Sequence, residues 1–425
     1  MSDRSNILVQ KYGGSSVATP EKIRSVAERV RRCRPENPRL VVVVSAMGKT
    51  TDQLVSLAHQ VSSQPRGREM DQLLASGEQI AVSLLGLALQ ELGVPAISLT
   101  ASQCGIHTDG SFNRARIHSI DIRRIHKELD KGKVVVIAGF QGITDGYEIT
   151  TLGRGGGDIT GAAIAAALRA SVCEICTDVD GVFSADPSVV SEARLLKEIS
   201  FEEAIELAAS GAKVLHPRAA EICMQYQIPI HVRSSFHMKP GTWIRGGETV
   251  LEKAGVVGVS ADKKIAKVTL LDVPDRPGIA AAVFEHLARA DVNVRLIIQS
   301  AAAEDRARIT FILDEDLVDG AMDLFERWKR EGIAGKILVD RNVAKISIVG
   351  SRLASVPGMA AKMFSALARE GINIDCISSS EMKVACVIAA EHLDRAVKAV
   401  HREFFPRGSE SANGSIRIAI SGEPV

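Results

Sequence analysis

The glycine-rich stretch Thr150–Thr160 carries the residue types best suited to chemistry in this chain. Arg154, three consecutive glycines and the carboxylate of Asp158 run directly into residues 161–168, whose alanines favour a helix. Free backbone N–H groups at the start of a helix, with a guanidinium beside them, suit a bound phosphate or carboxylate. The stretch therefore indicates an anion site, with Asp158 or Thr160 as the N-cap of the helix. A turn that only lets a helix begin would use the same glycines.

A strand–helix–strand unit must position such a site. Residues 7–11 are apolar and end at Lys11, which precedes the pair Gly13-Gly14. Thr19 caps a helix with one apolar stripe, and residues 40–44 form a β-branched run typical of a strand buried on both faces. In a parallel sheet, ligands bind at the carboxyl ends of the strands. We therefore expect Lys11 and the two glycines at a binding edge.

The end of the second strand carries Ser45 and the tripeptide Gly48-Lys49-Thr50. A P-loop would need another glycine five positions before Gly48, where Val43 stands, so we reject that motif. The hydroxyl, ammonium and carboxylate groups that remain at this strand end suit contact with a substrate. They are also ordinary residues for a turn.

A long helix is predicted over residues 68–92, and its second half is apolar almost all round, which indicates burial. Glu78 lies at the edge of that apolar body. A carboxylate in this position is either capped or salt-bridged, or it is held for the ammonium group of a ligand. Both interpretations stay open on these residues alone.

The rest of an α/β domain follows from further apolar segments. We expect strands at 95–99, 133–137, 172–176, 228–234 and 242–244, and a helix at 201–209. The segment Thr177–Pro187 is rich in turn residues and contains several carboxylates, which suggest contact with a nucleotide or a metal ion. A solvated loop with Asx turns would have the same composition. The domain is expected to end near residue 247.

Composition excludes some classes of function. The chain has 425 residues, with 52 Lys and Arg against 51 Asp and Glu, so no basic excess predicts binding to nucleic acid or to an anionic membrane. The first residues lack the pattern of a signal peptide, and no apolar run approaches the roughly 20 residues of a membrane helix. We therefore expect a cytoplasmic protein of two or three domains.

The seven cysteines are odd in number and scattered, which fits a reducing compartment. Cys173 and Cys176 have the spacing of a zinc or redox pair. They lie in the predicted strand 172–176, where residues three apart point to opposite faces, so we interpret both as core residues.

The last third of the chain is an internal repeat. A strand followed by Pro277-Gly278 recurs as a strand followed by Pro357-Gly358, and Phe284 recurs as Phe364, 80 positions later (364 − 284). Each unit predicts the order βαββαβ. Because units this small leave sheet edges uncovered, we expect them to pair within or between chains.

Six blocks of residues occur in a characteristic order and spacing. The blocks are Lys11–Val17, Ser45–Gly48, Gly77-Glu78, Gly153–Gly156, Thr177–Gly181 and Lys213–Arg218. Together with the repeat, they resemble the signature blocks of the aspartate kinases, within the amino-acid kinase superfamily. The chain is most similar to the short, monofunctional bacterial type with two C-terminal ACT domains, and the resemblance spans nearly its whole length.

The resemblance implies an α/β fold with a mainly parallel sheet of the amino-acid-kinase type, sandwiched by helices and followed by two βαββαβ, ferredoxin-like ACT domains. The catalytic domain would comprise residues 1–247, with a linker at 248–264. ACT domain 1 would comprise 265–340 and ACT domain 2 would comprise 341–425.

The implied reaction is transfer of the γ-phosphoryl group of ATP to the β-carboxylate of L-aspartate. It is the first step towards lysine, threonine, methionine and diaminopimelate. Mg²⁺ would be held mainly by the nucleotide phosphates, with no metal site made by the protein. Such a transfer needs positioning and positive charge rather than covalent help from the protein. The catalytic residues carried over are Lys11, Asp158 and Lys213, with Asp158 holding the two lysines in place.

The family's binding residues also carry over to this chain. Arg154 would bind a substrate carboxylate and Glu78 the substrate ammonium, in a pocket made of Ser45, Thr51, Glu78, Phe140, Arg154 and Gly157. The ATP site would consist of Lys11, Gly13, Gly14, Ser15, Gly155, Gly156, Thr177, Asp178, Phe183 and Lys213. The family usually has Ser where this chain has Gly157, and Arg where it has Ser188.

The ACT domains imply feedback control by lysine, threonine or both. The effector residues carried over are Asp275, Gln299, Asn373, Ile374 and Ser380, and Arg295 stands where the family often has Asp. A homo-oligomer formed through these domains is expected. Whether a shorter ACT-only product beginning near Met238 is also made, as in some relatives, stays open on the sequence alone. The alternatives are repeats that only dimerise the enzyme, a paralogue that phosphorylates another small carboxylate, and an amino-acid-binding protein with a weakened kinase module.

Overall fold

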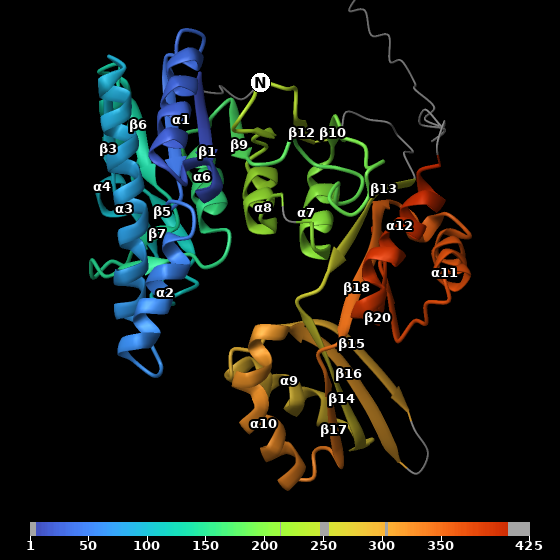
Figure 1. The fold of residues 1–425 in the computed structure, drawn as a ribbon. Helices are drawn as coiled ribbons and strands as arrows, with labels where there is room; N and C mark the ends of the chain where they lie inside the picture. The colour runs from blue at the N-terminus through green and yellow to red at the C-terminus, as the bar shows by residue number, and fades with distance from the viewer. Residues whose placement is uncertain (1–5, 213, 247–254, 302–304, 407–425) are drawn as a thin grey trace, which may run out of the picture. The chain divides into compact units, whose positions relative to one another are not determined.

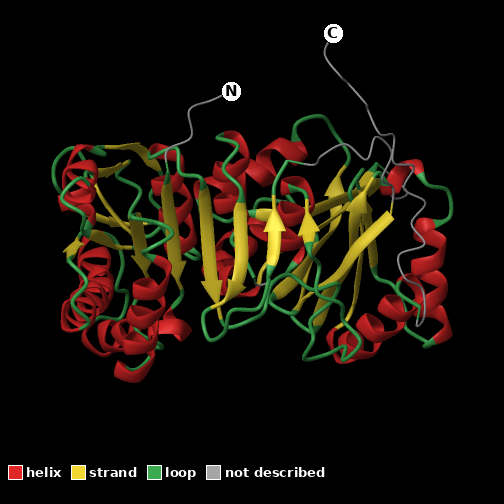
Figure 2. Cartoon of the chain, turned by 90° about the horizontal axis from the view of Figure 1, so that it is seen from above, coloured by secondary structure: helices red, strands yellow, loops and turns green. Residues whose placement is uncertain are grey.

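The computed structural model describes residues 6–212, 214–246, 255–301 and 305–406. These residues form two compact units. The first consists of Met1–Ser184, Arg194–Ala209 and Lys213–Val250, and the second of Ala185–Ala193, Ser210–Ala212 and Leu251–Val425. Figure 1 labels their elements and Figure 2 shows the strands of each unit packed against helices.

The first unit is built on an eight-stranded sheet with the strand order β10-β12-β11-β9-β1-β2-β6-β3. Neighbouring strands in it are parallel except β11 and β12, which are antiparallel. The strands are β1 (Ile7–Tyr12), β2 (Arg39–Val44), β3 (Ala96–Leu99), β6 (Val134–Ala138), β9 (Val172–Thr177), β10 (Glu198–Ile199), β11 (Ile230–Ser234) and β12 (Thr242–Ile244). The mainly parallel sheet expected from the sequence is confirmed.

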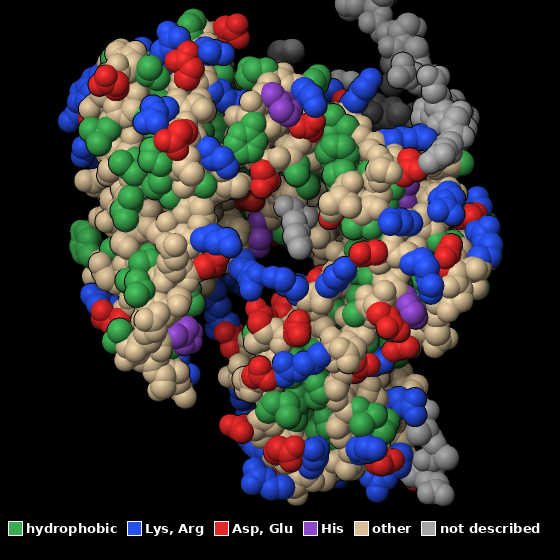
Figure 3. Space-filling model, in the orientation of Figure 1, with side chains coloured by type: hydrophobic (Ala, Val, Ile, Leu, Met, Phe, Trp, Pro, Cys, Tyr) green, Lys and Arg blue, Asp and Glu red, His purple; other side chains and the backbone are tan. Residues whose placement is uncertain are grey.

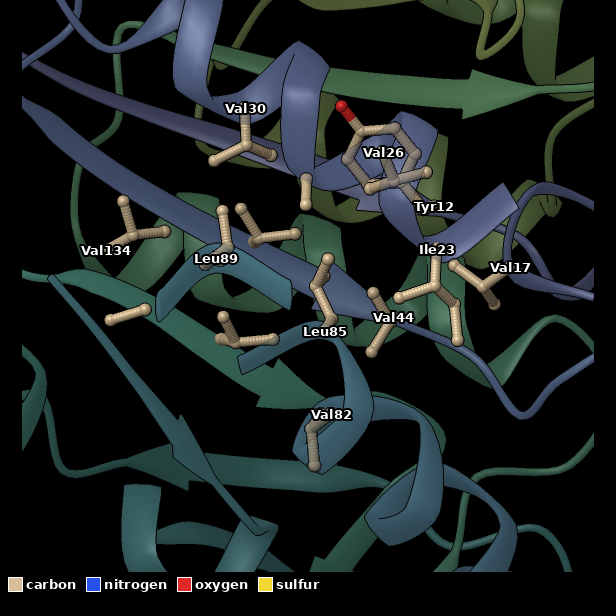
Figure 4. Close-up of a cluster of buried hydrophobic side chains, with 14 of the residues drawn as sticks. Tyr12, Val17, Ile23, Val26, Val30, Val44, Val82, Leu85, Leu89 and Val134 are labelled. Atoms are coloured by element: carbon tan, nitrogen blue, oxygen red, sulfur yellow. The ribbon is translucent and has the colours of Figure 1, made fainter. Parts of the chain in front are cut away.

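Helices cover both faces of this sheet. They are α1 (Pro20–Cys33), α2 (Thr50–Val61), α3 (Arg68–Glu91), α4 (Ala101–Cys104), α5 (Arg123–Leu129), α6 (Gly156–Ala167), α7 (Phe201–Ser210) and α8 (Pro217–Gln225), with a short 3-10 helix η1 (Gly14–Val17). Apolar side chains of α1 and α3 pack on one face of β1, β2 and β6, where Tyr12, Val26, Val44 and Leu85 meet (Figure 4). Burying each such side chain stabilises the fold by about 1.5–3 kcal/mol.

Helix α6 covers the opposite face of β1. Because side chains alternate along a strand, Tyr12 points to the side of α1 whereas Lys11 points to the side of α6. Gly161 allows the close approach of this helix, since a Cβ there would lie 3.1 Å from the Cβ of Lys11. Cys176 belongs to the core on the side of α1, and Cys173 lies near Gly161 on the side of α6. The two sulfurs therefore lie on opposite faces, as their spacing predicted.

A second, smaller sheet that the sequence did not predict lies within the first unit. Its order is β5-β4-β7-β8, from β4 (Ile106–Thr108), β5 (Ile117–Ile120), β7 (Gln141–Ile143) and β8 (Ile149–Thr151). Strand β8 leads directly into the glycine-rich stretch that precedes α6. These strands are only three or four residues long, too short for an alternating pattern to be recognised.

The start of α6 corrects one prediction. We expected Asp158 or Thr160 as N-cap, but the helix begins at Gly156 and its N-cap is Gly155, which has a left-handed backbone. Asp158 therefore lies in the first helical turn, where a carboxylate interacts favourably with the helix dipole. Thr160 lies inside the helix, and its hydroxyl donates to the carbonyl of Gly156 over 2.9 Å.

Helix α3 is long and apolar enough, by length and composition, to cross a membrane, contrary to our expectation that no segment would be. Half of that apolar window is buried inside the protein. Leu85 and Leu89, for example, lie in the core against the sheet (Figure 4). A core helix passes the same test, so we interpret α3 as part of the α/β core.

The second unit contains two four-stranded antiparallel sheets. The first repeat forms β14 (Ile265–Pro274), α9 (Ile279–Arg289), β15 (Val294–Ala301), β16 (Arg306–Asp314), α10 (Val318–Arg330) and β17 (Lys336–Asp340), which is the expected βαββαβ order. The second repeat forms β18 (Val343–Ser351), α11 (Met359–Arg369), β19 (Cys376–Ser379), β20 (Lys383–Ala389) and α12 (Leu393–Phe404). Its expected last strand would fall in residues 407–425, which are outside the described residues.

Strand β13 (Gly255–Asp262) fills the edge of the second repeat's sheet. The order of that sheet is β13-β18-β20-β19, and β13 pairs antiparallel with β18. The segment 248–264, which we expected to be a linker, therefore contains a strand. The pairing satisfies the N–H and C=O groups of β18 that would otherwise form a free edge. Residues 185–193 also belong to this unit, where Ala185 and Val190 pack in the core of the second repeat.

The surface carries both signs of charge. On the face drawn in Figure 3, Lys and Arg side chains are interspersed with Asp and Glu, in keeping with 52 basic and 51 acidic residues in the sequence.

Candidate active site at the carboxyl ends of the strands

An ion pair between β1 and α6 forms the centre of the candidate site. The Nζ of Lys11 lies 2.7 Å from the Oδ1 of Asp158, and their side chains are 11% and 13% exposed. Lys11 is the penultimate residue of β1, and Asp158 lies in the first turn of α6. An ammonium group is therefore held at the N-terminus of a helix, where the first N–H groups have no acceptor within the helix itself.

Two glycines bring the ends of β1 and β2 together. A Cβ on Gly14 would lie 2.8 Å from the carbonyl oxygen of Ala46, and the carbonyl of Gly14 accepts a hydrogen bond from the N–H of Gly48 over 3.0 Å. Gly13 follows β1 beside Lys11, since a Cβ there would lie 3.4 Å from the Lys11 Nζ. Ser15 continues this loop in η1. The glycines therefore bring the loops that follow these two adjacent strands into direct contact.

Gly155 is required by its conformation and by its neighbour. Its φ is +70°, and a Cβ there would overlap the imidazole of His216, lying 2.6 Å from the His216 Cβ. The N–H of His216 donates to the Oδ2 of Asp158 over 3.2 Å. Asp158 therefore joins Lys11 to the segment in which Lys213 occurs; Lys213 itself lies outside the described residues.

His216 was not assigned a role from the sequence. Burial lowers the pKa of its imidazole, so the ring is neutral near pH 7. The signal for it was the pair His216-Pro217, because Pro217 begins α8 and places His216 at the N-cap.

Ser45 and Gly157 share one small volume. A Cβ on Gly157 would lie 2.5 Å from the Ser45 Oγ and 3.0 Å from the Cε of Lys11. The glycine thus leaves space that the Ser45 hydroxyl and the lysine stem use. Thr51, another predicted pocket residue, lies in the first turn of α2, which follows the same strand end.

Glu78 lies in the buried part of α3 and reaches the same strand end. Its Oε1 accepts a hydrogen bond from the N–H of Ala46 over 2.9 Å, whereas its buried Oε2 has no hydrogen-bond partner among the described residues. Burial raises the pKa of this carboxyl from 4.5 to about 7, although the Ala46 hydrogen bond opposes the shift. Gly77 permits the approach, since a Cβ there would lie 2.9 Å from the Ala46 Cβ. A half-satisfied buried carboxylate suits a cationic ligand group.

Phe140 and Arg154 flank the start of α6. Phe140 has a positive φ of +68°, and its N–H donates to the Thr160 hydroxyl over 3.0 Å. A Cβ on Gly156 would lie 2.6 Å from the Phe140 ring, so the glycine lets the ring pack on the helix start. Arg154 is exposed one residue before the N-cap. Bulky residues rarely adopt a positive φ, and such strain concentrates at binding sites.

The residues predicted to flank adenine and ribose lie at the end of β9, the other neighbour of β1, and in the loop that follows it. The Thr177 hydroxyl donates to the Asp178 Oδ1 over 3.2 Å, and Asp178 is exposed. The Phe183 side chain is half-buried, and its backbone forms an isolated antiparallel β-bridge with Leu195. In the same loop, the carboxylate of Asp180 contacts the side chains of His237 and Lys239. The hydrogen bond from Lys239 lowers the pKa of Asp180.

The predicted effector residues lie in both repeats. Asp275 and Gln299 are exposed in the first repeat, and Asn373 and Ser380 are exposed in the second, with Ile374 half-buried. The structure thus divides the five residues between the two modules.

Arg295 stands where the aspartate kinases often have Asp. It forms ion pairs with Asp262 of β13 and with Asp314. Lys267 likewise pairs with Asp375, which precedes β19. Strands of the two repeats are therefore joined by charge pairs within this unit.

Comparison with known proteins agrees with this architecture. The model of the amino acid kinase family matches residues 6–234, and an ACT domain model matches residues 271–326 and 346–404. An aspartokinase of Mycolicibacterium smegmatis is 46% identical over 411 residues, which is 96% of this chain and 98% of the relative. An aspartokinase of Thermus thermophilus is 46% identical over 400 residues, which is 94% of this chain and 98% of the relative.

Solved structures give the same result. The crystal structure of E. coli aspartokinase III in complex with aspartate and ADP (R-state) aligns with a TM-score of 0.79 at 26% identity, covering 94% of this chain and all of that one (100%). The complex of the same enzyme with lysine and aspartate (T-state) aligns with a TM-score of 0.70 at 26% identity, covering 94% and 100% of the two chains.

Fold and site thus define a kinase of the amino acid kinase class, with ACT modules after its catalytic part. The identity extends over nearly all of this chain and of its relatives. The chain belongs to the aspartokinase family.

Proposed function

We propose that this kinase transfers the γ-phosphoryl group of ATP to the β-carboxylate of L-aspartate, giving 4-phospho-L-aspartate. The observation that carries the proposal is the Lys11–Asp158 ion pair of 2.7 Å at the N-terminus of α6. It places a cation at the N-terminus of a helix, and positive charge of this kind is what a transferring phosphoryl group requires. The aspartokinase relatives, 46% identical, support the choice of substrate.

In this proposal the two ends of the substrate are bound by different elements. Arg154 binds the α-carboxylate, Glu78 binds the ammonium group, and the hydroxyls of Ser45 and Thr51 lie towards the β-carboxylate. Phe140 and Gly157 complete the wall of the pocket. An oxygen of the β-carboxylate attacks the γ-phosphorus, and the bond between this phosphorus and the β,γ-bridging oxygen breaks. ADP leaves with the bridging oxygen and the electron pair of the broken bond. Lys11 and Lys213 stabilise the charge on the transferring group.

The nucleotide binds at the glycine loops. Gly13, Gly14 and Ser15 lie along the phosphates on one side, with Gly155 and Gly156 on the other. The N–H groups of Gly14, Ser15 and Gly155 would donate to phosphate oxygens, whereas those of Gly13 and Gly156 already donate to the carbonyls of Cys176 and Gly153. Thr177, Asp178 and Phe183 flank adenine and ribose. No cluster of three metal-ligating side chains occurs among the residues that the structure describes, so Mg²⁺ would be held mainly by the phosphates of ATP.

We further propose regulation by lysine, threonine or both, bound at the ACT modules near Asp275, Gln299, Asn373, Ile374 and Ser380. The chain would act as a homo-oligomer assembled through these modules, with a shorter ACT-only subunit beginning near Met238. All seven cysteines are free, which supports a place in the reducing cytoplasm.

The test is ADP release with Mg-ATP and L-aspartate, repeated with glutamate, N-acetylglutamate and other small acids, each with and without lysine plus threonine. Turnover on aspartate that these amino acids suppress is the expected result. Turnover on another acid but not on L-aspartate would show that the pocket has a different specificity, and it would refute L-aspartate as the substrate. Turnover on aspartate without suppression would reduce the repeats to assembly modules.

The raised pKa of Glu78 predicts a pH dependence. If Glu78 must be ionised to bind the ammonium group, kcat/KM for aspartate rises with pH and levels off above about pH 7. Glu78→Gln should lower kcat/KM about 10²-fold and remove this rise. A rise that persists unchanged in Glu78→Gln would assign it to another group.

The same carboxyl predicts an effect on stability with a defined sign. Its folded pKa of about 7 exceeds the unfolded value of 4.5, so the folded state binds the proton more tightly between these values. Wild-type stability should therefore fall relative to that of Glu78→Gln as pH rises from 5 to 8 (about 4.5 to 7 being the sensitive window). Thermal unfolding of both proteins at several pH values measures the difference.

The shared volume of Ser45 and Gly157 predicts a contrast between two substitutions. Gly157→Ala should lower kcat/KM for aspartate about tenfold, because the new methyl displaces the Ser45 hydroxyl and supplies no donor. Gly157→Ser should recover most of that loss, because its hydroxyl offers a replacement hydrogen bond. The matched control is Gly86→Ala, a buried helical glycine whose Cβ would meet only ordinary contacts at 3.8 Å. Equal losses in Gly157→Ala and Gly157→Ser would contradict this account.

A further inference from the structure

A buried carboxylate in the first turns of α3 has no part in the function proposed above. Asp71 has no exposed surface and lies seven residues before Glu78, which places the two carboxylates about two helical turns apart on the same side of α3. Burial raises the pKa of Asp71 while hydrogen bonds from its partners oppose the shift. Buried acids away from ion partners are rare, so its contacts indicate its role.

Asp71 accepts four hydrogen-bond contacts from two segments distant in sequence. The N–H of Asn113 lies 3.0 Å from its Oδ1 and 2.9 Å from its Oδ2. The N–H of Thr151 donates to Oδ2 over 2.7 Å, and the Thr151 hydroxyl donates to Oδ1 over 2.9 Å. Both oxygens are therefore used as acceptors, and both are needed.

These contacts hold an unfavourable backbone in place. Asn113 has a positive φ of +66°, and a Cβ on Gly153 would lie 3.0 Å from its carbonyl oxygen. The N–H of Ala115 donates to the carbonyl of Thr151 over 2.8 Å, which fastens the loop to β8. Asp71 thus fixes Thr151, two residues before Gly153, and Asn113, which packs against Gly153, the residue before Arg154.

The same helix fixes the opposite side of the pocket. Glu78 accepts from the N–H of Ala46, and Gly77 packs directly on Ala46. Helix α3 is therefore attached at Asp71 to the segment before Arg154, and at Glu78 to the end of β2.

We propose that Asp71 is a positioning residue that fixes the spacing between Arg154 and Glu78, and with it the recognition of both charged groups of an α-amino acid. This inference rests on the proposed function of those two residues. An amide is a poorer partner than the carboxylate, because the Asn113 N–H contacts both oxygens of Asp71 and would face the N–H₂ group of an Asn side chain in either orientation.

The main experiment compares Asp71→Asn with wild type in steady-state kinetics. We expect KM for L-aspartate to rise about tenfold or more, while KM for ATP changes less than twofold, since misplacement of one binding group affects one substrate. The matched control is Asp109→Asn, because Asp109 accepts from the N–H groups of Ser111 and Arg116 in the same loop over 3.1 Å each. It should leave both KM values unchanged.

A second measurement separates positioning from stability. Hydrogen–deuterium exchange of residues 111–116 and 149–155 should be faster in Asp71→Asn, with the sheet strands unchanged. Thr151→Val, which removes only the hydroxyl donor, should show the same kinetic effect more weakly, and the double variant should be less than additive.

The outcomes that overturn the inference are distinct from those that overturn the proposed function. Equal changes in both KM values would show that Asp71 serves stability alone. Unchanged hydrogen–deuterium exchange at residues 149–155 would show that Asp71 does not hold the segment before Arg154. A folded wild type that never phosphorylates aspartate would refute the substrate, and the exchange result would still decide whether Asp71 holds the segment before Arg154.

Discussion

Lys11→Met is expected to lower kcat by about 10³-fold or more, because the variant loses the cation that faces the transferring phosphoryl group. The Lys11 ammonium lies 2.7 Å from Asp158 and is only 11% exposed, so water and counter-ions cannot replace it readily. ADP release under saturating ATP and aspartate measures kcat, and a binding titration with ATP measures how much of the loss arises before chemistry.

The double variant Lys11→Met/Asp158→Asn separates catalysis from stability. The single change leaves a mostly buried carboxylate without its partner, which destabilises a fully buried pair by about 3–5 kcal/mol. Neutralising Asp158 in addition should restore much of the thermal stability and none of the activity. Recovery of activity with stability would show that Lys11 acts only through folding.

A control for charge removal lies at the opposite edge of the same sheet. Lys133 precedes β6 at its amino end, and its Nζ lies 2.8 Å from Glu128. Lys133→Met should alter kcat less than twofold, because Lys133 lies at the amino end of its strand and Glu128 keeps its ion pair with Lys131 over 3.0 Å.

Gly155→Ala should be the most damaging of the small substitutions at the site. Its φ of +70° disfavours any side chain by about 1–2 kcal/mol. In addition, the new methyl would overlap the His216 ring, and the displacement would move the first turn of α6 and the segment held by Asp158. We expect kcat/KM to fall about 10²-fold or more, since displacements of about 1 Å have this effect on a reacting geometry.

Gly93→Ala is the matched control for the free-energy cost of placing a side chain at a positive φ. Gly93 has the same φ of +70°, and no atom lies within 4 Å of its Cβ position. Its substitution should lower thermal stability by the left-handed penalty alone and leave kcat/KM unchanged. If the two variants lose activity equally, overlap with His216 is not the cause.

The local elements and the candidate chemistry were predictable because local rules decide them. The run Val41–Val44 predicted a buried parallel strand, and Thr19 with Pro20 predicted the start of α1, where the Thr19 hydroxyl accepts from the Lys22 N–H. The order of the glycine, lysine and acidic blocks predicted the family. The roles of the individual site residues stay predictions that the experiments above test.

Other features depend on contacts between segments that are distant in sequence. Nothing near Asp71 in the sequence indicates that Asn113 and Thr151 would donate to it, because those partners are 42 and 80 positions away. The helix start at Gly156 rather than at Asp158 depends on the packing of Phe140 and His216 against two glycines. The segment 248–264 was expected to be a linker, yet it contains strand β13, because a strand needs a partner edge before its pairing can be recognised.

The sequence by itself determined the βα units, the repeat of the last third and the chemical groups at the strand ends, because periodicity, caps and glycines act over a few residues. Only the tertiary structure decided which of those groups meet. Three contacts join elements that are far apart along the chain. They are the 2.7 Å ion pair of Lys11 and Asp158, the carboxylate of Glu78 with one oxygen hydrogen-bonded, and the carboxylate of Asp71 with both oxygens hydrogen-bonded. Burial and hydrogen bonding at such junctions exist only after the sheet has brought its strand ends to one edge.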